Sequence, residues 1–326
     1  MSDFWKGKKV LITGPTGLVG SFLTSALLYK GADIVTFVRD LDPQSELIKT
    51  GLINETRVVQ GSLEDYFSIE RAINEYEIDT VFHLGAQTIV DVALRSPLPT
   101  FESNVRGTYH LLEACRQHTD LVKRILIASS DKAYGTSPLL PYSEEMPLQG
   151  KHPYDVSKAC ADLIAHSYFH SYGLPVVIAR CGNIYGGGDL NWSRLIPGTI
   201  KSLLEDKTPL IRSDGTFQRD YLFVKDAVDA YLLLGKEASR EDISGEAFNF
   251  APNRPYTVLE VITEIQEVMQ KSDLSFQILN RAQKEIQNQF LSSKKAERLL
   301  GWRAKYSLRE GILETIPWYQ QHFANK

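Results

Sequence analysis

Tyr154 and Lys158 are two residues whose types and spacing suggest chemistry. They stand four residues apart at the start of a predicted helix, so both side chains project from one face of that helix. An ammonium group beside a phenol stabilises the phenolate, and a tyrosine in this state can accept a proton near neutral pH. The pair therefore indicates a tyrosine that acts as a base.

A second polar group, Ser130, Asp131 and Lys132, comes directly after a buried-looking strand over Arg124 to Ala128. It therefore lies at a carboxyl end of the predicted sheet, which is where ligands of such sheets bind. A second interpretation is that Asp131 and Lys132 simply pair with each other or with solvent. Both interpretations stay open from position alone.

A glycine-rich turn of the form GxxGxxG, Thr13 to Gly20, joins a short apolar strand to a helix. Glycines in such a turn let the backbone bend tightly and approach a pyrophosphate at the helix N-terminus, where free amides and the helix dipole favour negative charge. The turn therefore predicts a dinucleotide site. The residues expected to contact the dinucleotide there are Gly14, Thr16, Gly17, Leu18, Val19 and Gly20.

The end of the second strand, Val38-Arg39-Asp40, bears on which nicotinamide cofactor is bound. An acidic residue there accepts a hydrogen bond from the ribose hydroxyl of NAD, whereas an arginine accommodates the 2′-phosphate of NADP. Arg39 favours NADP as the cofactor, while Asp40 keeps NAD open. A third interpretation has both charges merely solvating a loop.

These residues must be positioned by the strands and helices that alternate along the first 180 residues. Strands joined by crossover helices predict an α/β fold of the Rossmann type, with a doubly wound parallel sheet and helices on both faces. The expected strands are Lys9 to Thr13, Asp33 to Val38, Arg57 to Gln60, Thr80 to Leu84, Leu121 to Ser129 and Pro175 to Arg180. The expected helices are Gly20 to Lys30, Ile69 to Tyr76, Asn104 to His118 and Tyr154 to Tyr172.

The alternation of strands and helices breaks at Cys181, and a loop-rich region begins at the glycine run 186–188. The rest shows scattered helices such as Val258 to Gln270, with strand candidates around Phe248 and Phe276. This change predicts a division of the chain into two parts.

Residues 1–180 are expected to form an NAD(P)-binding Rossmann domain. Residues 181–326 are expected to form mainly a smaller mixed α/β substrate domain, with some segments returning to the Rossmann sheet. A cleft between the two is the natural place for a ligand.

The composition restricts the partners and the compartment. The 326 residues include 36 Lys and Arg against 40 Asp and Glu, a formal charge of −4, so there is no global basic field for nucleic acid or for a membrane surface. No apolar stretch of about 18 residues predicts a membrane span. Three separated cysteines, without a CxxC pair, fit a reducing cytoplasm.

The sequence resembles, over nearly its whole length, the extended short-chain dehydrogenase/reductases that act on nucleotide sugars. Besides the glycine turn and the tyrosine–lysine pair, the resemblance rests on motifs spread along the chain. They are His83-Leu84-Gly85-Ala86, Asn104-Val105-Arg106-Gly107-Thr108, Arg180-Cys181-Gly182-Asn183-Ile184-Tyr185-Gly186, Arg194-Leu195-Ile196-Pro197, Arg219-Asp220-Tyr221, Phe248-Asn249 and Leu300-Gly301-Trp302.

The resemblance implies a catalytic triad of Ser130, Tyr154 and Lys158. In such enzymes Tyr154 would take the proton of the sugar's 4-hydroxyl, and Ser130 would hydrogen-bond that oxygen. Lys158 would hold the cofactor ribose, while the hydride of carbon 4 goes to the nicotinamide.

The resemblance also gives Asp131 and Lys132 a role after this oxidation. Simple 4-epimerases usually carry small residues after the triad serine or threonine. 4,6-Dehydratases carry an Asp-Glu pair there, an acid for the leaving 6-hydroxyl and a base for the carbon-5 proton. The same Ser-Asp-Lys is found in the CDP-glucose 4,6-dehydratase branch. Lys132 would then be the base, kept neutral by burial or by the charge of Lys158.

The chain departs from that branch at Gly215 to Tyr221, which has the GxxxRDY form of UDP- and dTDP-sugar enzymes instead of Arg-Pro-Trp-Gln. The leading hypothesis is a nucleotide-sugar 4,6-dehydratase acting on a UDP- or CDP-linked hexose or N-acetylhexosamine. Two alternatives stay open, a nucleotide-sugar 4- or 5-epimerase with a 4-keto intermediate and a non-catalytic NADP-sensing regulator on the same fold.

The resemblance implies further contact residues but no metal site. Ser62 stands where the family usually has an aspartate, so the adenine amino group would lose a carboxylate acceptor. Arg194 and Arg219 would contact the diphosphate, because arginine binds such oxyanions with charge-assisted bonds. Further cofactor contacts are expected from Ser62, Leu63, Leu84 and Ala86. The expected substrate contacts are Gln87, Asn183, Arg194, Leu195, Arg219 and Arg281. A homodimer through the helices Asn104 to His118 and Tyr154 to Tyr172 is also implied.

Overall fold

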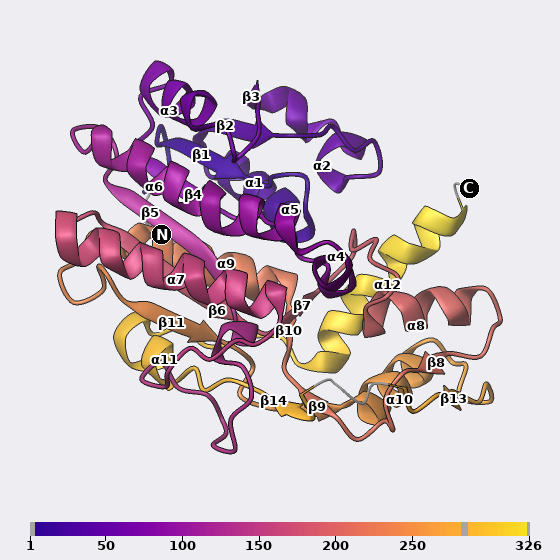
Figure 1. Cartoon of the computed structure of the whole chain (residues 1–326). Helices are drawn as coiled ribbons and strands as arrows, with labels where there is room; N and C mark the ends of the chain where they lie inside the picture. The colour runs from indigo at the N-terminus through magenta and orange to yellow at the C-terminus, as the bar shows by residue number, and fades with distance from the viewer. Residues whose placement is uncertain (1–3, 282–285, 325–326) are drawn as a thin grey trace.

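The computed structural model describes residues 4–281 and 286–324. Its centre is a seven-stranded sheet in the order β11-β6-β5-β4-β1-β2-β3, with every neighbouring pair parallel (Figure 1). The strands are β1 (Lys9–Thr13), β2 (Asp33–Val38), β3 (Arg57–Gln60), β4 (Thr80–His83), β5 (Arg124–Ser130), β6 (Val176–Cys181) and β11 (Ala247–Phe250). The predicted Rossmann-type α/β fold is confirmed.

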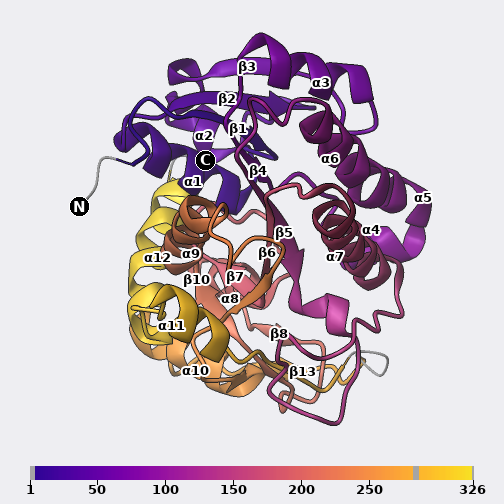
Figure 2. The ribbon, with the colours of Figure 1, turned by 90° about the vertical axis from the view of Figure 1, so that its left-hand side faces the viewer.

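Helices cover both faces of this sheet, because its apolar residues alternate between the faces. Leu11 of β1 packs in the core under one helical layer, whereas Val10 and Ile12 pack in the core under the other. Figure 2 shows the two layers on opposite sides of the strands. The first layer contains α3 (Tyr66–Glu75), α6 (Gly107–Gln117) and α7 (Pro153–Tyr172), and the second contains α1 (Leu18–Tyr29) and α9 (Val224–Glu237).

The strand order reverses between β1 and β4, since the chain builds outward from β1 to β3 and then returns to add β4 on the other side. In sheets of this kind the ligand binds at the carboxyl ends of the strands beside such a reversal. The glycine turn follows β1, and the Ser130 group ends β5, so both sequence-predicted sites lie at this edge.

Much of the chain after Gly182 forms a smaller group of helices and short strands beside this edge (Figure 1). Its helices share one apolar core. They are α8 (Leu195–Leu204), α10 (Val258–Val268) and α12 (Leu308–Ala324). Its strands are β7 (Asn183–Tyr185), β8 (Leu210–Ile211), β9 (Gln218–Arg219), β10 (Tyr221–Phe223), β12 (Tyr256–Thr257), β13 (Gln277–Ile278) and β14 (Asn288–Gln289). Short helices elsewhere are α2 (Glu46–Lys49), α4 (Val90–Arg95), α5 (Pro97–Phe101) and α11 (Lys294–Leu300).

Several predicted bounds differ from the observed ones. α1 begins at Leu18, two residues before the predicted start, and β5 begins at Arg124 rather than Leu121. The helix predicted to begin at Asn104 directly follows other helical residues in the structure. Its predicted start lies inside a π-helical turn, Glu102–Arg106, and this turn continues into α6. Among the later elements, β11 pairs with β6 in the main sheet and α9 covers one face of it. The boundary at residue 180 itself stays a prediction.

Candidate active site

A large cavity opens along the carboxyl edge of the sheet and extends to the smaller group of elements. It encloses about 1570 Å³. Pockets for single small molecules usually span about 300–1000 Å³, so this cavity has room for two ligands. Its lining includes the glycine turn after β1, the ends of β2 and β5, the residues that follow β4, and the start of α7. From the later chain it includes the start of α8 and residues of β9 and β10.

The glycine turn forms a close-fitting cradle at the N-terminus of α1. A Cβ atom on Gly20 would lie 2.2 Å from the carbonyl oxygen of Gly14, and one on Gly14, whose φ is +66°, would lie 2.8 Å from the backbone of Gly85. Gly17 caps α1 without any side-chain bond to its first amides. These amides lie in the cavity wall, where they suit a dinucleotide pyrophosphate.

Thirteen of the fourteen residues expected to contact the cofactor line this cavity. They are Gly14, Thr16, Gly17, Leu18, Val19, Gly20, Arg39, Asp40, Leu63, Leu84, Ala86, Tyr154 and Lys158. Ser62 is not part of the lining, and its hydroxyl donates to the carboxylate of Glu64. Glu64 does line the cavity, so a carboxylate that the sequence prediction missed lies two residues after the serine.

Arg39 and Asp40 lie together at the end of β2 on the cavity wall. The Arg39 Nε donates to Asp40 Oδ2 over 2.6 Å, and both side chains are largely exposed. Each charge therefore partly neutralises the other, and the pair is free to rearrange around a ligand because exposed ion pairs are weak.

Ser130, Tyr154 and Lys158 all line this cavity, and all three residues are buried. Against the larger effect of burial, the Ser130 side chain lowers the pKa of the Tyr154 hydroxyl, so the two groups are neighbours in the site. Lys158 Nζ donates to the carbonyl oxygen of Ala128 over 2.8 Å. The proposed triad therefore lies at one place, although the lysine bonds the backbone of β5.

Burial changes the acid strength of these groups. It raises the pKa of Tyr154 to about 12, against the opposing effect of the Ser130 side chain. Burial lowers the pKa of Lys158 to about 8. Since a phenol with so high a pKa is a poor proton acceptor at neutral pH in its resting form, Tyr154 needs added positive charge nearby before it can work as a base.

Asp131 and Lys132 begin the short 3₁₀ helix η3 (Asp131–Tyr134) directly after β5. Ser130 Oγ donates to Asp131 Oδ1 over 3.0 Å, while Asp131 Oδ2 is buried without a partner. Lys132 Nζ donates instead to the side-chain oxygen of Gln289 over 2.5 Å. Within residues 4–281 and 286–324 no ion pair joins Asp131 to Lys132, so the interpretation in which they simply pair with each other is wrong. Gln289 was missed by the sequence analysis.

Five of the six predicted substrate residues line the same cavity, namely Gln87, Asn183, Arg194, Leu195 and Arg219. Arg194 pairs with Asp189 over 3.0 Å, and Arg219 donates to three backbone carbonyls. Arg281 is exposed and lies outside the lining. The structure therefore brings together every predicted substrate residue except Arg281.

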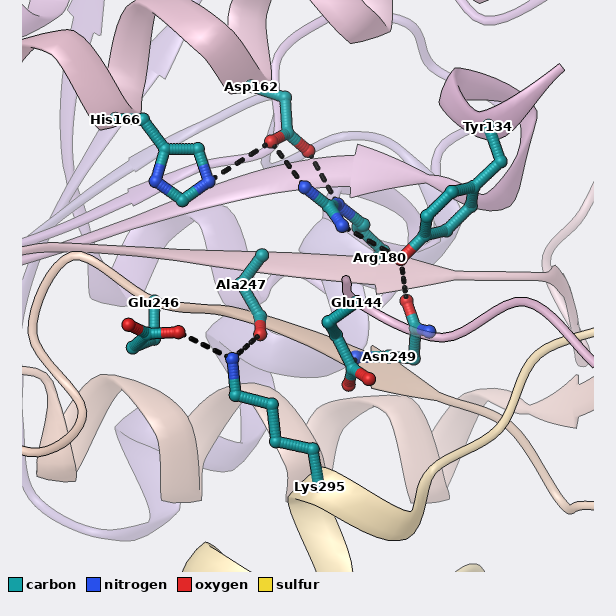
Figure 3. Close-up of polar contacts among 9 residues, drawn as sticks. All are labelled: Tyr134, Glu144, Asp162, His166, Arg180, Glu246, Ala247, Asn249 and Lys295. Atoms are coloured by element: carbon teal, nitrogen blue, oxygen red, sulfur yellow. Dashed lines mark hydrogen bonds and ion pairs between the residues drawn. The ribbon is translucent and has the colours of Figure 1, made fainter. Parts of the chain in front are cut away.

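A buried polar network joins residues of β6, α7, η3 and β11 (Figure 3). Arg180 of β6 forms two hydrogen bonds with Asp162 of α7, over 2.8 and 2.7 Å. It also donates to the Tyr134 hydroxyl, which in turn donates to Asn249 Oδ1 of β11 over 2.8 Å. The network thereby joins α7, which carries Tyr154, to the end of η3.

Replacement of Arg180 by Leu is expected to destabilise the protein by about 3–5 kcal/mol, because the buried Asp162 carboxylate loses both arginine hydrogen bonds and keeps His166, 3.5 Å away. The Arg180 and Asp162 side chains are 4% and 0% exposed, so water does not compensate. Urea unfolding monitored by circular dichroism measures the change. The control is Arg71→Ala, which breaks an exposed pair on α3 and should change stability by less than about 1 kcal/mol. Equal effects of the two variants would contradict the prediction.

Asp220, between β9 and β10, is expected to make stability depend on pH. Burial, followed by the nearby Asp131, raises its pKa from 3.8 to about 7. Between these values the folded state binds one proton more than the unfolded state, so the free energy of unfolding falls as pH rises through this window. An asparagine keeps an acceptor for the Leu291 amide that Asp220 now binds but does not titrate.

Asp220→Asn should therefore reduce the loss of stability between about pH 5 and about pH 7, as measured by urea unfolding. Asp120→Asn, at an exposed position, should leave this loss unchanged. A variant of Asp220 with the wild-type pH dependence would show that the carboxyl does not titrate in this range.

Metal sites and membrane-spanning helices are two further possibilities in the part of the chain that the structure describes. No group of three or more His, Cys, Asp and Glu side chains there could hold a metal ion. Among the same residues, no helix is both long and apolar enough to cross a membrane.

Comparison with known proteins gives matches along almost the whole chain. The family model described as GDP-mannose 4,6 dehydratase matches residues 11–315. The CDP-glucose 4,6-dehydratase of Salmonella typhimurium is 28% identical over 98% of this chain and 92% of its own length. The dTDP-D-glucose 4,6-dehydratase of Bos taurus is 30% identical over 98% of this chain and 90% of its own length.

Solved structures of similar proteins have the same overall fold as this chain. The dTDP-glucose 4,6-dehydratase of Streptomyces venezuelae, crystallised with NAD bound, superposes with a TM-score of 0.88 at 26% identity, over 97% of this chain and 98% of that one. The UDP-glucose 4-epimerase of Thermotoga maritima, crystallised with UDP-glucose, also has a TM-score of 0.88, at 25% identity, over 97% of this chain and 99% of that one.

Proposed function

Since this chain belongs to the GDP-mannose 4,6 dehydratase family, we propose that it is a nucleotide-sugar 4,6-dehydratase that works with a nicotinamide cofactor. The observation that carries the proposal is the arrangement of Asp131 and Lys132 beside Ser130 and Tyr154 in one cavity. An acid and a base are the groups that loss of water requires in addition to the oxidising site.

The glycine cradle and the end of β2 suit the cofactor. When bound, an oxidised nicotinamide supplies a hydride acceptor for sugar carbon 4, the same hydride for return to carbon 6, and a positive charge near Tyr154. Lys158 is the residue proposed to hold the cofactor ribose, and Gly14 and Gly20 let the pyrophosphate approach the backbone.

We propose NADP as the preferred form, because the Arg39 guanidinium at the end of β2 can pair with a 2′-phosphate. Asp40 opposes this choice, and the dehydratase of Streptomyces venezuelae was crystallised with NAD. Titration of the protein with NADP and NAD, followed by calorimetry, tests the choice. Arg39→Ala should weaken the binding of NADP but not that of NAD. If the wild type binds NAD more tightly than NADP, the proposed preference is overturned.

The first half of the reaction is oxidation at carbon 4. Tyr154 takes the proton of the 4-hydroxyl as the hydride leaves, and Ser130 holds that oxygen with a hydrogen bond. The product is a 4-keto sugar, whose carbonyl makes the proton on carbon 5 acidic.

The second half is loss of water. Lys132 removes the carbon-5 proton, and the electron pair of that bond forms the double bond between carbons 5 and 6. Asp131 in its protonated form gives its proton to the 6-hydroxyl, which leaves as water. After hydride returns to carbon 6, the ammonium of Lys132 gives its proton back to carbon 5. Tyr154 has then gained one proton and Asp131 has lost one, so a single proton transfer between them resets the site.

The substrate is a hexose or N-acetylhexosamine carried by a nucleoside diphosphate, UDP or CDP in our proposal. Arg194 and Arg219 line the cavity, and we assign these two arginines to the two phosphates. Asn183 is assigned to a phosphate or sugar oxygen. Arg281 has no part in this assignment because it lies outside the lining.

A nucleotide-sugar epimerase is the second candidate, since a UDP-glucose 4-epimerase superposes with the same TM-score as a dehydratase. Incubation with UDP-, CDP-, GDP- and dTDP-linked hexoses, followed by mass spectrometry and NMR, separates the two. A product that has lost water and gained a methyl signal supports the dehydratase. Unchanged mass with changed ring couplings would support the epimerase instead.

We also propose that the protein is a cytoplasmic homodimer and that residues 1–180 of each subunit form its NAD(P)-binding domain. All three cysteines are free, which suits a reducing compartment. The helices α6 and α7 expose Tyr109, Leu163 and Tyr172, which are apolar enough for a subunit contact. Sedimentation analysis tests the dimer, and a monomer at micromolar concentration would overturn it.

A further inference from the structure

Gln289 is a fully buried amide that contacts both residues of the proposed acid and base pair. Its side-chain oxygen accepts a hydrogen bond from Lys132 Nζ over 2.5 Å. Its side-chain nitrogen donates to the carbonyl oxygen of Asp131 over 3.1 Å. Both polar atoms of the Gln289 side chain therefore form hydrogen bonds with residues of η3, although Gln289 lies 157 residues from Lys132 in the sequence.

The strand that carries Gln289 is held on two sides. β14 pairs with β9 so that Gln289 lies opposite Arg219, and Arg219 also donates to the carbonyl of Gln287 over 2.7 Å. On the other side, the amide of Tyr142 donates to the carbonyl of Phe290 over 2.9 Å. The backbone that carries Gln289 is therefore held by contacts that do not involve Lys132.

The neutral charge of the amide matters as much as its position. A lysine acts as a base only when it is uncharged, and a carboxylate partner would stabilise its ammonium form. An amide oxygen accepts one N–H of the amine and leaves the nitrogen lone pair free to take up a proton. Glutamine is therefore suited to orient this lysine without charging it.

We propose that Gln289 is a positioning residue for the loss of water, which holds the Lys132 amine toward sugar carbon 5 without placing a negative charge beside it. The inference rests on the proposed function, because it assumes that Lys132 is the base. It adds a residue that acts through Lys132 and does not touch the sugar.

The titratable and charged groups of the elements around Lys132 are the background against which this effect is measured. They include Asp131 and Tyr134 on η3, His152 before α7, Tyr154, Asp155 and Lys158 in α7, and Arg219 and Asp220 in and after β9. Each is left unchanged in the variants below, so a change in pH dependence reports the side chain at position 289.

Two variants of the full-length, cofactor-loaded protein test the proposal, Gln289→Glu and Gln289→Leu. The protein is mixed rapidly with the nucleotide sugar that the product panel identifies, while cofactor reduction is followed by absorbance and water loss by mass spectrometry. A misplacement of about 1 Å in a catalytic group can cost about 100-fold in rate. Both variants should slow water loss by about 100-fold near neutral pH and leave carbon-4 oxidation unchanged, so reduced cofactor accumulates.

The two variants should differ in pH dependence. Gln289→Glu should recover water loss as the pH rises, because the ammonium then loses its proton, whereas Gln289→Leu should stay slow at every pH. Asn288→Asp is the matched control, since it adds a carboxylate to the same strand at an exposed position. It should keep the wild-type rate and pH dependence.

The outcomes separate this inference from the proposed function. If Lys132→Ala keeps full water loss, the base assignment fails whatever position 289 does. If Lys132→Ala blocks water loss but Gln289→Glu keeps the wild-type rate and pH profile, the inference on Gln289 is overturned. It is also overturned if oxidation and water loss fall together in Gln289→Glu, because that result indicates a structural role. Should Gln289→Leu fail to fold, the nearly isosteric glutamate variant decides alone.

Discussion

Replacement of Tyr154 by Phe is expected to abolish reduction of the cofactor by the nucleotide sugar, with a loss in rate of about 10²–10⁴, the range for removal of a general base. The change removes one oxygen from a side chain that is 9% exposed and lines the cavity. The ring stays, and Ser130 keeps its bond to Asp131, so the cavity should keep its shape.

Stopped-flow absorbance of the reduced nicotinamide measures this rate, and calorimetry with the cofactor measures binding, which should be unchanged. Tyr29→Phe, at a side chain that is 92% exposed, is the control for a tyrosine-to-phenylalanine change. Substantial cofactor reduction in Tyr154→Phe would remove this tyrosine from its proposed role.

Lys132→Ala is expected to separate the two halves of the reaction. Carbon-4 oxidation needs Tyr154 and Ser130, which do not depend on the lysine side chain. Water loss needs a base for the carbon-5 proton and should fall by about 10²–10⁴. The variant should therefore hold reduced cofactor and a 4-keto sugar that keeps its 6-hydroxyl.

The two halves are measured in one rapid-mixing experiment, by absorbance for oxidation and by quenched mass spectrometry for water loss. Lys151→Ala, an exposed lysine on the same stretch of chain, is the control and should behave as the wild type. Full dehydratase turnover in Lys132→Ala would contradict the assignment of the base, and equal loss of both steps would indicate a structural role for the side chain.

The parts of this site that could be predicted from the sequence are those that depend on neighbouring residues. The turn from Gly14 to Gly20 combines a strand, three glycines and a helix within a short segment, and a Cβ atom on Gly14 or Gly20 would clash with the backbone. Tyr154 and Lys158 share a helix, so their common face follows from helical geometry. Ser130 ends a strand, which puts it at the ligand-binding edge of a parallel sheet.

The parts that could not be predicted depend on contacts between distant segments. Gln289 meets Lys132 only because β14 pairs with β9, and a strand of two residues has no periodic signal. The burial of Asp220 depends on the same packing. α9 is a different case, because Val224, Ala227, Val228 and Tyr231 repeat at helical spacing and are all buried, so the pattern for this helix was present in the sequence.

The central claim is that the hydride taken from sugar carbon 4 returns to carbon 6 after water is lost. The most direct test uses the nucleotide sugar that the protein converts, labelled with deuterium at carbon 4, and locates the label in the product by NMR and mass spectrometry. We predict a 4-keto-6-deoxy sugar with the deuterium in its methyl group. Deuterium that returns to carbon 4, in a product of unchanged mass, would contradict the dehydratase and establish an epimerase.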